Sequence, residues 1–320
     1  MRIVGIDTSS ATASVALLED GQLIAERCHP GSIAGHVAGL AGFKSNHAEI
    51  LLPLIESVIV ESRLSLAEVS GIALSIGPGS FTGLRIGLST VKGLAYGWGI
   101  PVVGVSTLLA QAARAGDPST RTLAAAGGHS LGIPPENRGP VLSQRGSTGS
   151  PPRGRSRGSE SKGVESGDSG LDGGLHFDGV ICALLDARKH EVYVALFRKS
   201  KRGLTRLTED LLVPVEDVIG QMRSRIGSMP CLLIGDGARR YEKLLLDALG
   251  VKAQLCAEDS VSSCAAAVAR LGMERFRNSE SEELGTLVPV YLRPSEAEAK
   301  RSNLTDGKFA AKATLTKIPP

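Results

Sequence analysis

The turn Gly77–Ser80 has few side chains and is here called the bare turn. Its residue types suit the binding of an anion such as a phosphate. It joins an apolar run, Gly71–Ile76, to a helical pattern that starts near Thr82. Free backbone N–H groups and the dipole at the start of a helix can bind an anion. The spacing matches neither GxxxxGKS/T nor GxGxxG, so a purely structural turn is the competing interpretation. The candidate phosphate-binding residues of the turn are Gly77, Gly79, Ser80 and Thr82.

A carboxylate follows the first apolar run of the chain, Ile3–Ile6, at Asp7. Thr8 and Ser9 continue into a small polar turn. A carboxylate in this place can orient a phosphate or hold a metal ion through water. It can equally hydrogen-bond to its own turn. Asp7, Thr8 and Ser9 therefore complete a candidate nucleotide site, beside a structural interpretation of the same residues.

No further group of residues has the spacing of a known metal motif. The sequence lacks HExxH, and its six histidines are scattered. An odd number of cysteines without CxxC spacing is typical of reduced, buried thiols in the cytosol. We therefore expect reduced thiols and no metal site. The cysteines are Cys28, Cys182, Cys231, Cys256 and Cys264.

The composition indicates a globular protein. The chain has 320 residues, 42% of them hydrophobic, and a formal net charge of +3. A charge so close to neutral argues against a protein dominated by binding to nucleic acid. The start of the chain lacks the apolar core of a signal peptide, and no run of about 18 apolar residues follows. We expect a cytoplasmic protein that makes no membrane contact.

The order of elements predicts two similar halves separated by an insert. Each half opens with an apolar strand that ends in Asp, a short turn, and a second strand closed by Gly; Asp7 matches Asp186, and Gly21 matches Gly203. Residues 115–178 are rich in Gly, Ser and Pro and carry no hydrophobic period, so we expect them to be disordered. The predicted domains are residues 1–114 and 179–298, with a flexible tail at 299–320.

The helix expected after the bare turn carries glycines on one side. At about 100° per residue, Gly83, Gly87, Gly93 and Gly97 fall within an arc of roughly 120°. Each glycine costs a helix about 1 kcal/mol relative to alanine. The bare face therefore predicts that a neighbouring element packs very close to it.

Six segments, in order along nearly all of the chain outside the insert, together resemble the TsaB (YeaZ) family. They are IDTSSATASVAL, HAEILLPLI, GPGSFTGLRIGLSTVKGLA, PVVGVSTL, LLDARKHEVYVALF and PVYLRP. The resemblance implies an α/β protein with an actin-like ASKHA fold: two ribonuclease-H-like halves with mixed sheets and helices packed on them. It also implies a role in making N6-threonylcarbamoyladenosine at position 37 of tRNA, as a non-catalytic paralogue of TsaD.

The resemblance also implies what the chain lacks. TsaD-type proteins carry an HxxxH pair that holds a metal, and the corresponding residues here are Thr107 and Gln111. Neither is a good ligand for a transition metal. The implied protein therefore has no metal and needs no cofactor, although a weak or vestigial site for ATP or ADP is compatible with it.

The partners implied are a TsaD homologue, which the chain binds and activates as a heterodimer, and a TsaE-type ATPase in a larger complex. Contact with tRNA would run through that complex, and the isolated protein could form a homodimer. The contact with TsaD is implied on two helices, and a charge at Leu54 or Val58 is expected to break it while leaving the fold intact. The implied interface residues are His47, Leu51, Leu54, Ile55, Val58, Gly83 and Gly87.

Two enzymatic alternatives remain open. A small-molecule kinase of the same fold class would bind ATP with Asp7 and the turn Gly77–Gly83, and would use Asp186 or the segment Gly235–Gly237 as its catalytic acid. A metallopeptidase is the second alternative, and the absent HxxxH argues against it.

Overall fold

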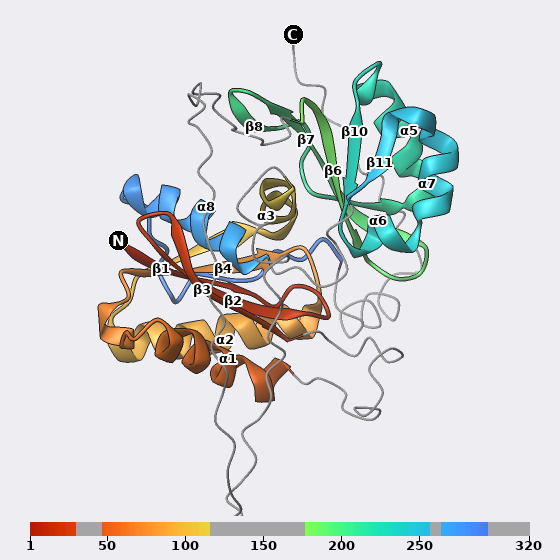
Figure 1. The fold of residues 1–320 in the computed structure, drawn as a ribbon. Coiled ribbons are helices and arrows are strands. Elements are labelled where there is room, and N and C mark those ends of the chain that lie inside the picture. The colour runs from red at the N-terminus through yellow and green to blue at the C-terminus, as the bar shows by residue number, and fades with distance from the viewer. Residues whose placement is uncertain (30–46, 116–176, 257–263, 294–320) are drawn as a thin grey trace, which may run out of the picture.

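In the computed structural model, residues 1–29, 47–115, 177–256 and 264–293 are described. They form two halves, each built on one mixed sheet (Figure 1). The predicted disordered insert, apart from residues 115, 177 and 178, and the predicted flexible tail lie outside the described residues.

The first sheet has the strand order β3-β2-β1-β4-β5. Its strands are β1 (Arg2–Asp7), β2 (Ala13–Glu19), β3 (Gln22–His29), β4 (Gly71–Gly77) and β5 (Val102–Ser106). Strands β1, β2 and β3 form an antiparallel meander, whereas β1, β4 and β5 run parallel. The carboxyl ends of the parallel strands thus meet at one edge, where Asp7 and the bare turn lie.

The second sheet repeats this order as β8-β7-β6-β10-β11. Its strands are β6 (Gly179–Asp186), β7 (Glu191–Ser200), β8 (Gly203–Arg206), β10 (Cys231–Ile234) and β11 (Ala253–Leu255), and β9 (Leu211–Pro214) pairs with β7. Again the strands of the opening meander, β6, β7 and β8, pair antiparallel, as does β9 with β7, whereas β6, β10 and β11 run parallel. The predicted duplication is confirmed, with Asp7 and Asp186 ending equivalent strands.

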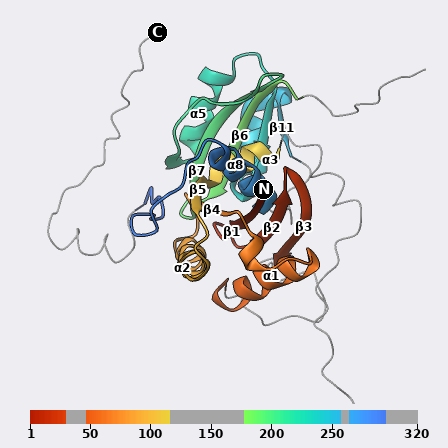
Figure 2. The same cartoon turned by 90° about the vertical axis from the view of Figure 1, so that its left-hand side faces the viewer.

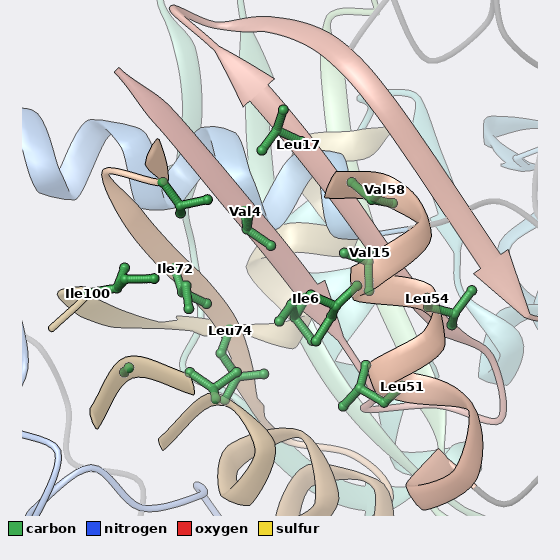
Figure 3. Packing of buried hydrophobic residues seen from close by; sticks show 14 of the residues in the cluster. Val4, Ile6, Val15, Leu17, Leu51, Leu54, Val58, Ile72, Leu74 and Ile100 are labelled. Carbon is green, nitrogen blue, oxygen red and sulfur yellow. The ribbon is translucent and has the colours of Figure 1, made fainter. Parts of the chain in front are cut away.

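Two helices, α1 (His47–Glu61) and α2 (Phe81–Trp98), cover the outer face of the first sheet (Figure 1). Apolar side chains spaced three and four apart on α1 point at the sheet, and they meet apolar residues on alternate positions of β1, β2 and β4. Figure 3 shows this core from close by, with α1 contributing Leu51, Leu54 and Val58.

Two further helices, α3 (Thr107–Arg114) and α8 (Ala265–Arg277), lie between the two sheets (Figure 2). Helix α8 packs on β1, β2, β4 and β5, and its small residues allow a close approach. A Cβ atom on Gly5 would collide with the α8 backbone, and one on Gly272 would collide with Ala73. Helix α8 was expected within the second domain, residues 179–298, whereas its packing is with the first sheet.

The second sheet carries α5 (Val215–Ile226) and α7 (Glu242–Leu249) on its outer face, and α6 (Asp236–Arg240) beside the end of β6. Helices α6 and α7 are separated by the single residue Tyr241. Short 3-10 turns occur at Leu66–Glu68 and Gly250–Lys252.

After α8, the segment of residues 278–293, here called the C-terminal strap, runs from the first half to the second. The Glu282 amide bonds to the Val102 carbonyl (2.9 Å) on the open edge of β5, and the Val290 amide bonds to the Ile76 carbonyl (2.7 Å). Arg293 reaches the Ala187 carbonyl (2.7 Å). The strap therefore ties the two halves together.

Among the described residues, no helix combines the length and the apolar character needed to cross a bilayer.

Candidate functional site

Asp7 is buried, and its carboxylate is committed to its own turn. One oxygen, Oδ1, accepts hydrogen bonds from the Ser9 amide (3.0 Å) and the Ser9 hydroxyl (2.6 Å). This is the local carboxylate-to-backbone pattern that stabilises turns. Of the two interpretations of Asp7, the geometry favours the structural one.

The bare turn is held against that same Asp7 turn. The Ser80 amide donates to the Ser9 carbonyl (2.6 Å), and the Ser80 hydroxyl accepts from the Gly83 amide (3.2 Å) as the cap of α2. A Cβ atom on Gly79 would collide with the Ser9 carbonyl. Two of the amides at this turn, those of Ser80 and Gly83, are thus bonded within the chain, while Thr82 is exposed on the first turn of α2. The vestigial nucleotide site stays a prediction.

The glycines of α2 divide into two pairs. The first pair, Gly83 and Gly87, faces the carbonyl and hydroxyl of Thr8 so closely that neither position has room for a Cβ atom. The second pair, Gly93 and Gly97, is exposed, with no heavy atom of another element within 4 Å of the Cβ position. Among the described residues, the expected close packing therefore occurs at the first pair and not at the second.

The carboxylates at the end of the second sheet also lie together. Asp236 accepts a hydrogen bond from the Asp186 amide (2.9 Å), and Asp186 is paired with the Arg240 guanidinium (3.0 Å). Burial of its carboxyl group raises the pKa of Asp236, and the nearby charge of Asp186 adds to this rise. The kinase alternative needs a free carboxylate here, and Asp186 is already engaged by Arg240.

The residues at the places of the TsaD histidine pair are both buried on α3. The Thr107 hydroxyl has no hydrogen-bond partner among the described residues, and the Gln111 side chain accepts from Arg114 (3.3 Å). Within the same residues, no three His, Cys, Asp or Glu side chains gather as metal ligands would. A hydroxyl and an amide in these places do not supply the ligands of a transition metal.

The implied partner residues on α1 need correction. Leu51, Leu54, Ile55 and Val58 are at most 3% exposed, because they form the core between α1 and the first sheet (Figure 3). They are therefore not available to a partner, and the expectation that a charge there would spare the fold is wrong. Gly83 and Gly87 are buried as well. His47 remains accessible at the start of α1, where its Nε2 lies 3.1 Å from the Ala11 carbonyl.

A different set of residues is exposed on these two helices. Large apolar side chains project into solvent from α1 and α2, and Gly93 and Gly97 are exposed on α2 as well. Helical periodicity could have located them, since they fall outside the buried stripe of each helix. The exposed set, here called the outer face, comprises Leu52, Val60, Tyr96 and Trp98 together with the two glycines.

Two sheets of the same strand order, each opened by an antiparallel hairpin, define an actin-like protein of the ASKHA class with two ribonuclease-H-like halves. YeaZ from Pseudomonas aeruginosa shares this fold with a TM-score of 0.58 at 22% sequence identity, over 91% of this chain and 99% of that one.

Sequence comparisons indicate which proteins of this fold class the chain resembles. A family model described as "TsaD: tRNA N6-adenosine threonylcarbamoyltransferase" matches residues 42–133. The Bacillus subtilis (strain 168) protein named "tRNA threonylcarbamoyladenosine biosynthesis protein TsaB" is 27% identical over 300 residues, which cover 94% of this chain and 97% of that protein. The protein of the same name from Escherichia coli (strain K12) is 39% identical over 129 residues, about half (49%) of its length. The chain is thus similar to proteins of the TsaB (YeaZ) family along nearly its whole length.

Proposed function

We propose that this chain is the docking subunit of the machinery that makes N6-threonylcarbamoyladenosine at position 37 of tRNA in the cytoplasm. It binds a TsaD homologue through the outer face of α1 and α2 and activates that protein for transfer of the threonylcarbamoyl group. A TsaE-type ATPase joins the larger complex. The chain itself neither performs the transfer nor requires a cofactor.

The observation that carries the proposal is the pair Gly93 and Gly97. Each lowers the stability of α2 by about 1 kcal/mol relative to alanine. Because no described residue of another element lies within 4 Å of either Cβ position, packing among the described residues does not offset this cost. A bare helix stripe lets a helix of another molecule come very close, as small residues do at tight helix contacts generally.

The surroundings of the glycine stripe fit the same interpretation. Tyr96 is 88% exposed, Val60 67%, and Leu52 and Trp98 52% each. Exposed apolar side chains gathered on two neighbouring helices are typical of a surface that another protein covers. The same surface accounts for a homodimer of the isolated chain, in which a second copy covers the outer face.

The pathway is tested by nucleoside analysis of tRNA from cells depleted of this protein. We expect threonylcarbamoyladenosine to disappear and to return when the wild-type chain is supplied. Retention of the modified nucleoside, with the other proteins of the pathway present, would contradict the proposal.

A further inference from the structure

The turn between β6 and β7 has an unusual backbone. Three consecutive residues that are not glycine, Arg188, Lys189 and His190, have φ angles of 62°, 53° and 58°. The Glu191 amide closes the turn by donating to the Arg188 carbonyl (3.0 Å). Left-handed residues cost side-chain-bearing amino acids about 1 kcal/mol or more each, and hairpin turns of this shape favour Asn and Gly. Arg, Lys and His therefore disfavour the backbone conformation that they adopt in this turn.

Contacts from three other elements hold the turn in this shape. The strap residue Arg293 donates to the Ala187 carbonyl (2.7 Å) and pairs with Glu191. The Arg188 amide donates to the Asp186 carboxylate (3.0 Å), and the Val215 amide at the start of α5 donates to the His190 carbonyl (3.0 Å). Strain that the surroundings maintain in this way points to a functional role for the side chains.

The same contacts leave the turn positively charged. Glu191 is neutralised by Arg293, and Asp186 by Arg240. Arg188 and Lys189 are exposed and form no ion pair with any described residue. The turn thus presents two cations that have no ion-pair partner among the described residues, together with an imidazole.

We propose that the β6–β7 turn binds the phosphate backbone of RNA. All three side chains are exposed at the tip of the β6–β7 hairpin, whereas a nucleotide site would need a concave surface around the ligand. Two neighbouring cations on an exposed turn suit the phosphates of a polynucleotide, which they contact without reading sequence. That the RNA is a tRNA rests on the proposed function.

The test compares two glycine substitutions at opposite ends of β7. Lys189→Gly removes one charge and relieves a left-handed residue, so the fold is retained or stabilised. Lys201→Gly, in the β7–β8 turn, removes the same charge at the other end of β7. The two sites are about 30 Å apart, because β7 has 10 residues and each residue of a strand advances about 3.3 Å. Binding of an unmodified tRNA transcript is measured for the full chain alone and mixed with its TsaD homologue, over a range of salt concentrations.

We expect Lys189→Gly to weaken tRNA binding about five- to tenfold near 0.1 M salt and to reduce the salt slope by about one, while Lys201→Gly leaves both unchanged. Equal affinities for Lys189→Gly and wild type, or no tRNA binding by the wild type in either form, would overturn the proposal. So would a loss confined to ATP binding. If tRNA binding is lost as expected but the wild type does not associate with TsaD, the proposed function fails and this site stands.

Discussion

The Ser80 amide donates a 2.6 Å hydrogen bond to the Ser9 carbonyl, so the turn before α2 rests on the turn after β1. Gly83, one turn further along α2, lies directly against the Thr8 carbonyl. The start of α2 is therefore closed by the chain itself, and the two turns form one packed unit.

The first prediction concerns this unit. Gly83→Ala places a Cβ atom where the Thr8 carbonyl lies, and we expect it to lower the free energy of unfolding by about 1–3 kcal/mol. Gly93→Ala, in the same helix, should raise it by up to about 1 kcal/mol, because alanine is the better helix former and nothing opposes it. Urea unfolding measures both. Equal effects would show that the two glycine pairs do not differ as described.

The second prediction separates core from surface on α1. Leu54→Asp buries an uncompensated carboxylate in the core and should leave the protein insoluble or unfolded. Val60→Asp, on a side chain that is 67% exposed, should leave the melting temperature within a few degrees of wild type. Soluble expression and circular dichroism check both variants. A folded Leu54→Asp protein would mean that this face of α1 is not part of the core.

The third prediction concerns pH. Burial raises the pKa of the Cys231 thiol to about 12, whereas an unfolded thiol titrates near about 8.5. The folded state keeps a proton that the unfolded state loses, so the stabilising contribution is complete below about pH 8.5 and falls as the pH rises toward 12. Between pH 8 and 10.5, Cys231→Ala should lose less stability than wild type, by up to about 2.5 kcal/mol. Parallel losses in urea unfolding at the two pH values would count against a buried thiol.

Local patterns in the sequence predict much of the fold. The matching strand-Asp-turn-strand units at Asp7 and Asp186 depend on short-range periodicity, and the structure bears out the duplicated sheets. The packing of α8 on the first sheet was not predicted, because it joins Gly5 to Ala265 across most of the chain. The anchoring of the β6–β7 turn by Arg293 is likewise a long-range contact.

The proposed docking surface could not be identified from the sequence alone. An apolar stripe such as Leu51, Leu54 and Val58 fits a core and an interface equally well, and only the tertiary contacts distinguish them. The four glycines of α2 form one stripe by helical spacing. Gly83 nevertheless packs against Thr8, whereas no described residue of another element lies near the Cβ position of Gly93. Sequence periodicity locates such stripes but does not say what covers them.

The most direct test of the proposed docking compares two substitutions of exposed helix glycines. The first is Gly93→Glu, at a residue of the outer face. The second is Gly220→Glu, at a residue of α5 in the second half. At both residues no heavy atom of another element lies within 4 Å of the Cβ position. Both replace glycine with a better helix former, so neither should destabilise the isolated chain. Association with the TsaD homologue is measured by titration calorimetry. Our account predicts that Gly93→Glu weakens binding at least tenfold while Gly220→Glu binds like wild type, and unchanged binding by a folded Gly93→Glu protein would contradict it.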